Sequence, residues 1–213
     1  MLKSTVSLVI MVCFAAGFVG CKKDDPAPTP LTATTFKNLA ADPPSGGYNP
    51  TNGQPIGVTK KYTFFSFSSG AVVVNADSAS AKWDIGFNGT NIIVNSGTSG
   101  PGMGAAQVQS GIFDEITTAP NDGYLKDNKS TTPAFYAITR GSDKGWYHYD
   151  PSTNIITPIA GKVLIIQTAD GKYAKMEILS YYQDAPAAPT SSTKDRYYTF
   201  RYIYQSNGSK TLK

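Results

Sequence analysis

The chain has 213 residues, 16% of them charged, and a formal net charge of +4. A charge this small, with Lys and Arg scattered rather than clustered, argues against nucleic-acid binding. The length suits one domain behind an N-terminal leader, and the abundance of Gly, Pro, Thr, Ser and Tyr is typical of a turn-rich extracellular β protein.

Residues 1–20 are expected to be a signal peptide. Lys3 supplies a positive charge, and the apolar run at 6–19 is shorter than the roughly 20 apolar residues of a membrane-spanning helix. The sequence FVGC at 18–21 resembles a bacterial lipobox, which predicts cleavage before Cys21 and a covalent lipid on this cysteine. An ordinary signal peptide that happens to contain cysteine is the alternative, but no A-x-A cleavage site is present. Because Cys13 leaves with the signal, no intramolecular disulfide is expected.

A flexible tether is expected over residues 21–35. The sequence KKDDPAPTP, which follows Cys21, begins with four charges and continues with prolines between small residues, so it cannot build a core. A charged run behind a lipidated cysteine resembles the export signal of Bacteroidota surface lipoproteins. The sequence therefore predicts attachment to the outer membrane through the lipid anchor, with cell-surface display as a finer expectation. The β domain is expected over 36–213.

Strand patterns begin after an irregular, turn-rich segment at 38–57. The sequence YTFFSF at 62–67 carries aromatic residues on both faces, which predicts a strand buried on both sides. A second strand is expected after the turn at 68–70, and WDIGF at 83–87 alternates like a third. Asn88-Gly89 predicts a tight turn before a strand at 92–94. The glycine-rich segment 97–111 lacks the lysine of a phosphate-binding loop, so we expect a flexible loop.

The strongest strand pattern lies in the second half of the chain. Residues 163–168 and 173–181, joined by a turn at 169–171, predict a hairpin, and 195–205 predicts a closing strand. Met176 alternates with apolar neighbours, which indicates a core residue. The segment KGWYHYDPSTNIITP at 144–158 is interpreted as a strand and a turn. Nothing supports a long helix, so the predicted fold is a single, mainly antiparallel all-β domain.

The sequence lacks the residue sets that catalysis requires. His148 is the sole histidine, no G-x-S-x-G motif is present, and no group of zinc ligands is visible. Paired carboxylates such as Asp114-Glu115 are better interpreted as solvated turns. The sequence therefore predicts a binding protein and not an enzyme.

Four segments in order resemble the HmuY family of Bacteroidota haem-binding lipoproteins. They read YTFFSFSSGAVV, KWDIGF, NSGTSGPGMGAA, and GWYHY followed by GKVLIIQTADGKYAKMEILSYY, and they cover most of residues 60–204. The resemblance implies a HmuY-like all-β fold, surface capture of haem for haem uptake, and transfer of haem to an outer-membrane TonB-dependent receptor.

The founding member of the family holds haem iron between two histidines and some relatives use methionines instead, so the resemblance implies that ligation here departs from the histidine pair. One family histidine corresponds to the turn at 150–154, which reads DPSTN here, and the other to the polar stretch 126–144, which contains no histidine. Iron also accepts Met, Tyr or Cys as axial ligand. The candidate haem-binding residues are Met103, His148, Tyr147 and Tyr149, and the iron of haem is the only metal expected.

Each candidate has a structural alternative. Met103 is otherwise an exposed loop residue, and His148 a packed or surface histidine on a strand. His148 shares a strand face with Trp146, whereas Tyr147 and Tyr149 share the other. A family member that has lost haem binding and serves as an interaction module for a glycan, a protein or another small ligand is the alternative function, because aromatic residues serve sugar stacking, porphyrin stacking and core packing alike.

Overall fold

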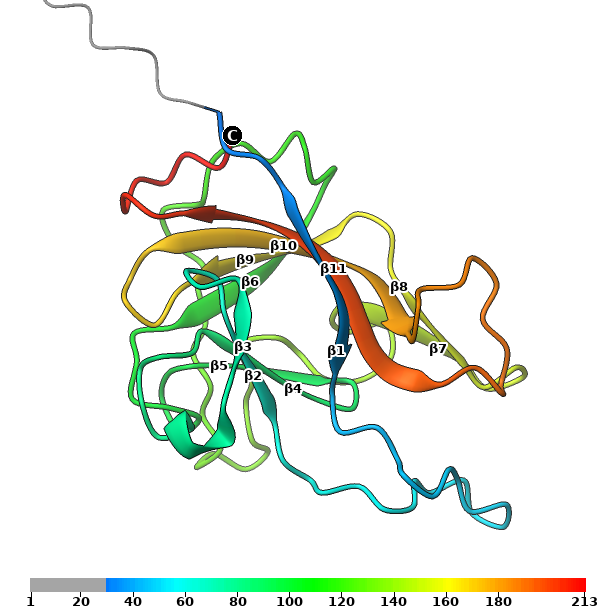
Figure 1. Ribbon diagram of the computed structural model, residues 1–213. Coiled ribbons are helices and arrows are strands. Elements are labelled where there is room, and N and C mark those ends of the chain that lie inside the picture. Colours follow the sequence, from blue (N-terminus) through cyan, green and yellow to red (C-terminus); the bar gives the residue numbers. More distant parts are fainter. Residues whose placement is uncertain (1–29) are drawn as a thin grey trace, which may run out of the picture.

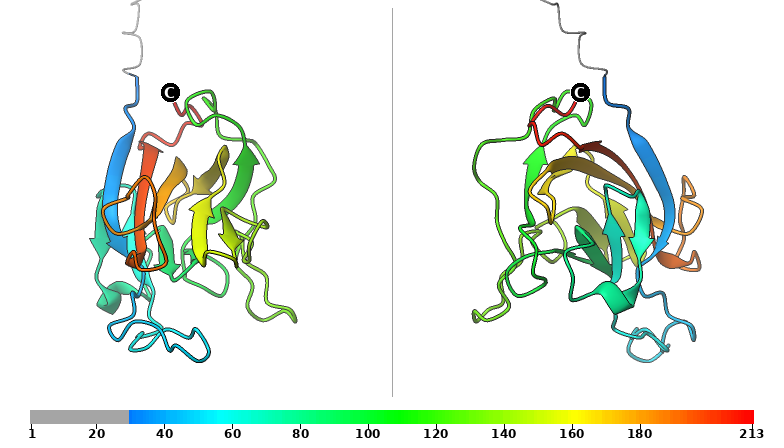
Figure 2. Two further views of the ribbon diagram at one scale, coloured as in Figure 1. Left: turned by 90° about the vertical axis from the view of Figure 1, so that its right-hand side faces the viewer. Right: turned by 60° about the vertical axis from the view of Figure 1, so that its left-hand side comes forward.

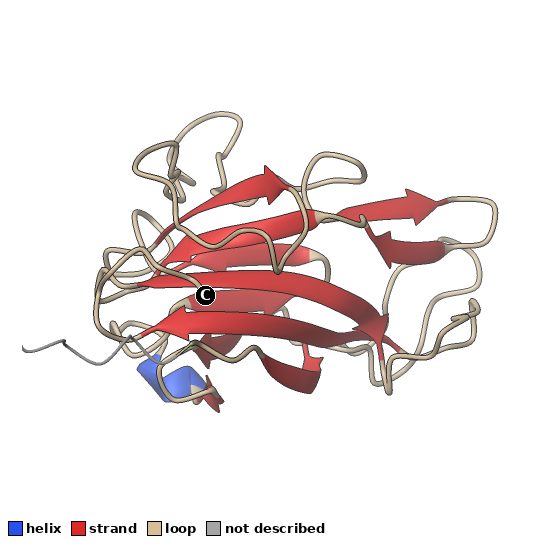
Figure 3. Ribbon diagram, turned by 90° about the horizontal axis from the view of Figure 1, so that it is seen from above, coloured by secondary structure: helices blue, strands red, loops and turns tan. Residues whose placement is uncertain are grey.

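The computed structural model describes residues 30–213, so the predicted signal peptide, Cys21 and most of the tether lie outside the described residues. This part of the chain forms eleven strands and one short 3₁₀ turn, η1 (Asn75–Asp77) (Figure 3). All strand pairs between β1 and β11 are antiparallel, which confirms the predicted fold class. Within 30–213, no helix has the length and hydropathy needed to cross a bilayer.

Two sheets and a hairpin make up the fold (Figure 1). The large sheet has the strand order β1-β11-β10-β9-β6, the small sheet has the order β3-β2-β4-β5, and β7 pairs with β8. The large sheet consists of β1 (Thr34–Ala40), β6 (Ala105–Ser110), β9 (Lys162–Gln167), β10 (Tyr173–Tyr182) and β11 (Asp195–Gln205). The small sheet consists of β2 (Thr63–Ser66), β3 (Ala71–Val73), β4 (Ile85–Asn88) and β5 (Asn91–Val94), and the hairpin of β7 (Tyr147–Asp150) and β8 (Ile155–Pro158).

Both edge strands of the large sheet differ from the sequence-based expectations. β1 begins at Thr34, so it includes the last two residues of the expected tether, and β6 lies inside the segment expected to be a flexible loop. The glycines before β6 are in close contact with other backbone: a Cβ on Gly97 would lie 2.0 Å from the carbonyl oxygen of Asp127, and one on Gly104 would lie 2.8 Å from that of Asn95. The segment is therefore a packed loop followed by a strand, because glycine allows this close approach.

The main core lies between the two sheets. Phe65, Phe87 and Ile92 of the small sheet are buried with Met176 and Phe200 of the large sheet in one cluster, which confirms the predicted core role of Met176. The opposite face of β2 is also covered, because Phe64 packs against Trp83 with ring centroids 4.4 Å apart. The prediction that this strand is buried on both faces is confirmed.

A second core covers the outer face of the large sheet. Val163, Ile165 and Ile203 are buried there against Phe113 and Leu212, from the segments that follow β6 and β11. Lys175 lies on the same face with 1% exposure, and its ammonium donates hydrogen bonds to the carbonyls of Phe113 (2.6 Å) and Ile116 (2.8 Å). These two bonds satisfy a buried charge and fix the covering segment to the sheet.

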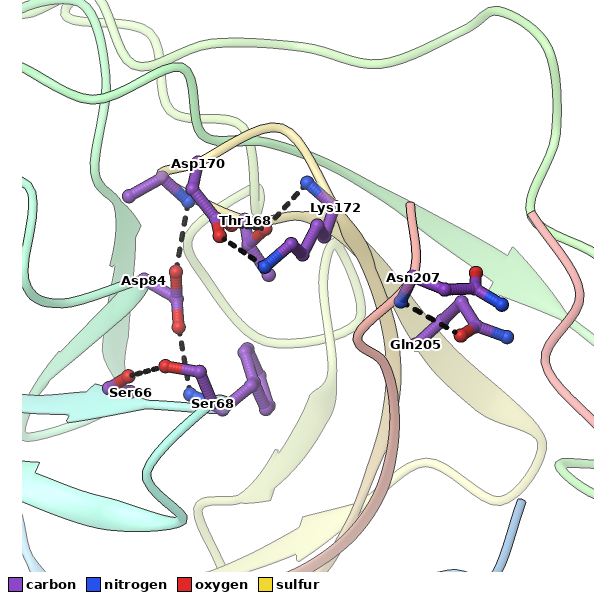
Figure 4. Close-up of polar contacts among 10 residues, drawn as sticks. Ser66, Ser68, Asp84, Thr168, Asp170, Lys172, Gln205 and Asn207 are labelled. Carbon is purple, nitrogen blue, oxygen red and sulfur yellow. Dashed lines mark hydrogen bonds and ion pairs between the residues drawn. The ribbon is translucent and has the colours of Figure 1, made fainter. Parts of the chain in front are cut away.

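Asp84 connects the two sheets at the end of the core where β9 turns into β10 (Figure 4). One carboxylate oxygen accepts a hydrogen bond from the amide of Phe67 after β2 (2.7 Å), and the other accepts one from the amide of Ala169 in the β9–β10 turn (2.9 Å). The side chain is buried, and this burial raises the pKa of Asp84 above its ordinary value. One residue thus satisfies amides from both layers of the fold.

The variant Asp84→Ala is expected to lower the free energy of unfolding by about 3 kcal/mol, because it leaves two buried amides without an acceptor. Urea unfolding followed by tryptophan fluorescence measures the change. The control is Asp77→Ala, which removes a surface ion pair with Lys82 and should cost about 1 kcal/mol or less. Equal unfolding midpoints for the two variants would contradict the role given to Asp84.

Candidate functional site

A pocket of about 470 Å³ opens beside the β7–β8 hairpin. Its walls come from the loop after β1, the β4–β5 turn, the hairpin, and the end of β10 with the loop that leads into β11. Figure 2 shows the backbone of these segments. A volume of this size falls within the range of small-molecule sites. Its lining residues are Tyr48, Gly53, Pro55, Thr90, Tyr149, Asn154, Ile156, Tyr181, Tyr182, Thr190, Ser191, Thr193, Asp195 and Arg196.

Irregular pairing at the start of β11 shapes one wall of the pocket. Tyr182 pairs with Asp195, whereas Ser180 pairs with Thr199, so β11 has extra residues between these two positions. Arg196 lies in this bulge and has a φ of +62°, a left-handed conformation that is uncommon for a residue other than glycine. A bulge bends its strand and changes the direction of the side chains, which here places Asp195 and Arg196 in the pocket wall.

The aromatic floor of the pocket continues into the core. The ring of Tyr181 lies 5.8 Å from that of Trp146 and 5.3 Å from that of Tyr198, and both of these partners are buried. Tyr182 fixes the hairpin in place, because its hydroxyl accepts a hydrogen bond from the amide of Ile156 (2.9 Å). The floor is therefore rigid and largely apolar, with the hydroxyl of Tyr182 already occupied.

The polar side of the pocket is formed by Tyr48, Asp195 and Arg196. The Tyr48 hydroxyl donates to the Asp195 carboxylate at 2.5 Å, which connects the loop after β1 to the start of β11. Burial raises the pKa of Asp195 above that of an ordinary aspartate. Arg196 donates from Nη1 to the carbonyl of Asp42 (3.1 Å), and among residues 30–213 it forms no ion pair. One side of the pocket thus offers both a carboxylate and a guanidinium.

Tyr149 is the one sequence-predicted candidate that lines this pocket. Its side chain is 37% exposed, and its hydroxyl donates to Oδ1 of Asn154 (2.7 Å) across the hairpin. Tyr147 lies on the same strand face but is buried against Trp146, with ring centroids 4.9 Å apart. Tyr147 therefore supports the pocket from the core without lining it.

His148 and Met103 lie elsewhere. The His148 side chain points away from the core, is about half exposed, and has Nδ1 2.8 Å from the Asp143 carboxylate. Met103 is in the loop before β6, where its amide donates to the carbonyl of Ala169 and its methyl group lies next to Gly171, in the turn that precedes β10. Because the pocket is at the other end of this ten-residue strand, roughly 30 Å away, Met103 and Tyr149 cannot share one ligand.

The turn at 150–154 is built by its own side chains. The Asp150 carboxylate accepts hydrogen bonds from the amide and hydroxyl of Ser152 (2.8 and 2.7 Å) and from the hydroxyl of Thr153 (2.8 Å), which lowers the pKa of Asp150. Asn154 follows with a φ of +59° and places its amide in the pocket. Within the part of the chain that the structure describes, no group of three or more His, Cys, Asp or Glu residues could hold a bare metal ion.

Sequence reasoning missed Tyr48, Tyr182, Asp195 and Arg196. Tyr48 and Asp195 are 147 positions apart, and neither belongs to a motif of fixed spacing. The only available signal was the tyrosine-rich pair of segments SYYQD and DRYY, which the pocket brings together.

Comparisons with known proteins identify a family. The family model described as HmuY protein matches residues 58–202, from just before β2 into β11. Similar solved structures include a Bacteroides vulgatus protein described as HmuY-like and heme binding, with 19% identity, a TM-score of 0.49, and coverage of 81% of this chain and 91% of that one. Apo PinO from Porphyromonas gingivitis has 14% identity, a TM-score of 0.48, and coverage of 83% and 97%. A search of curated proteins gave no match.

The variant Tyr48→Phe is expected to loosen the loop at 43–58, because it removes a hydrogen bond to a carboxylate that is worth about 2 kcal/mol. Hydrogen exchange measured by mass spectrometry should show faster exchange in this loop, while the exchange of β9 and β10 is unchanged. Tyr149→Phe is the matched control, since it removes a hydroxyl from the same pocket but not from this loop. Unchanged exchange at 43–58 would show that the Tyr48–Asp195 contact does not hold the loop.

Proposed function

Because the chain belongs to the HmuY family, we propose that it is a lipid-anchored outer-membrane protein that captures haem and passes it to a TonB-dependent receptor. The observation that carries this proposal is the aromatic pocket beside the β7–β8 hairpin, which borders Asn154 in the turn where the family resemblance implies a ligand. Haem is the cargo in this proposal, and no catalytic step is assigned to the protein.

The pocket residues fit a flat, largely apolar ligand with acidic groups. Tyr48 and Tyr149 supply exposed aromatic surface of the kind that packs against a porphyrin, and the buried rings of Tyr181 and Tyr182 support it from below. Arg196 supplies a guanidinium of the type that pairs with carboxylates, such as the haem propionates. The chain cannot provide two histidines, since His148 is its only one, so iron ligation here must differ from the family's histidine pair.

The arrangement of the two ends of the domain supports surface capture. Leu31 packs against the cluster that contains Leu212, so the chain enters the domain near the end of β11 (Figure 1). The pocket is at the beginning of β11, eleven residues or roughly 35 Å away. A lipid attached at Cys21 would therefore join the domain at the end opposite the pocket, which leaves the pocket accessible to incoming haem or a receptor.

Titration of the purified full chain in detergent with ferric haem should give a saturable Soret change at one haem per chain. The protein-free micelle, titrated in parallel, corrects for haem that partitions into detergent. A spectrum identical to that of the micelle blank at every haem concentration would exclude haem capture.

A second candidate is an interaction module that does not bind haem. The observation that favours it is the composition of the pocket, which has no histidine or methionine but has Asn154, Thr190, Ser191 and Thr193 beside its aromatic residues. Aromatic faces with hydroxyl and amide groups suit a glycan or another small polar ligand. A negative haem titration combined with saturable binding on a glycan array would select this function.

Anchoring through Cys21 predicts that Cys21→Ala moves the chain out of the membrane fraction when expressed in a bacterium that processes lipoproteins. Cys13→Ala is the matched control, because Cys13 lies within the expected signal peptide and its loss should leave the chain in the membrane fraction. Protease treatment of intact cells then reports display, since a surface-exposed domain is digested and a periplasmic one is protected. Retention of the Cys21→Ala chain in the membrane fraction would contradict lipid anchoring.

A further inference from the structure

We propose that Tyr149 is the axial ligand of the haem iron, bound through its phenolate oxygen. This inference rests on the proposed function and names the residue that would hold the iron. Tyrosine is an established axial ligand of haem. Tyr149 lines the pocket, is 37% exposed and is therefore accessible to an incoming ligand.

The hydroxyls of the other three tyrosines of the pocket donate to a carboxylate, accept a backbone hydrogen bond or are buried, whereas the hydroxyl of Tyr149 bonds only to the exposed amide of Asn154. Tyr48 donates its proton to the Asp195 carboxylate, and a phenolate there would face a second negative charge. Tyr182 is 4% exposed and accepts a hydrogen bond from the amide of Ile156, so its oxygen points at the hairpin backbone. Tyr181 is 2% exposed and packs between Trp146 and Tyr198.

The remaining iron-binding side chains within residues 30–213 are outside the pocket. Met176 is fully buried in the core between the sheets, and Met103 is at the opposite end of β10. His148 is one residue from Tyr149 but on the other face of β7, where it contacts Asp143. Alternation along the strand thus directs the imidazole away from the pocket that the phenol lines.

Two neighbours suit the charge of a bound phenolate. Asn154 now accepts the Tyr149 proton through Oδ1, and rotation of its amide would present the NH₂ group as a donor to the same oxygen. Arg196 lines the same pocket and, among the described residues, forms no ion pair. It adds a positive charge to the pocket wall, where it also faces the Asp195 carboxylate.

The coordination step is balanced without any redox partner. The O–H bond of Tyr149 breaks, its proton passes to water, and the phenolate oxygen forms a bond to iron that stays Fe(III). Oxygen is a hard donor, so the bond favours ferric over ferrous iron.

The test uses the full chain in detergent, loaded with ferric haem and studied by absorption and resonance Raman spectroscopy. The wild type should show a phenolate-to-iron charge-transfer band and phenolate vibrations. Tyr149→Phe should lose both signals and bind haem about tenfold more weakly or worse. His148→Ala should keep both signals, because this side chain lies on the other face of β7, and Tyr149→His should replace them with an imidazole-ligated spectrum.

Several outcomes separate this inference from the proposed function. If the wild type binds haem without phenolate signals, or if Tyr149→Phe keeps them, the assignment of Tyr149 is overturned and haem capture stands. If the wild type binds no haem, the proposed function fails and the inference fails with it. Far-UV circular dichroism and urea unfolding of Tyr149→Phe, which removes one partly exposed hydroxyl, check that its fold is intact.

Discussion

The buried carboxylate of Asp84 holds the two layers of this fold in register. Backbone amides that are buried at a sheet end need an acceptor, and here the amides of Phe67 and Ala169 come from different sheets and use the same side chain. The apolar contacts between the sheets are large but non-directional, so they do not by themselves fix how the layers are placed. The two hydrogen bonds at Asp84 are directional, so they fix the relative position of the two sheets at the end of the core opposite the pocket.

A chain of aromatic contacts connects this interface to the pocket. Phe65 meets Phe200 at 5.2 Å between ring centroids, Phe200 meets Phe87 at 5.8 Å, and Phe87 meets Tyr198 at 4.8 Å. Tyr198 then meets Tyr181 of the pocket floor. The floor is thus an extension of the core, which explains how a pocket bounded by loops can have a fixed apolar surface. The polar groups of the bulge and the hairpin lie at the rim of this surface.

Under the proposed function, the pocket offers an iron-binding position in a HmuY-family chain with one histidine. The β7–β8 hairpin brings Tyr149 to the pocket and turns His148 away, so the residue that stands out in the sequence is not the one that the fold presents. In the proposed mode of binding, a single phenolate replaces the family's histidine pair, and the surrounding tyrosines supply packing.

The sequence by itself determined the fold class and most of the central strands, because β2, β9, β10 and β11 carry their own alternating or continuous apolar patterns. It did not reveal β1 and β6, since an edge strand depends on hydrogen bonds from one neighbour and shows a weak apolar pattern. Tyr149 was recognised as a candidate from its place next to the family's ligand turn. Only the tertiary structure brought Tyr48, Asp195 and Arg196 to it and separated it from Met103. The physical reason is that strand pairing brings together residues separated by more than half of the chain. The local spacing of residues in the sequence does not reveal such contacts.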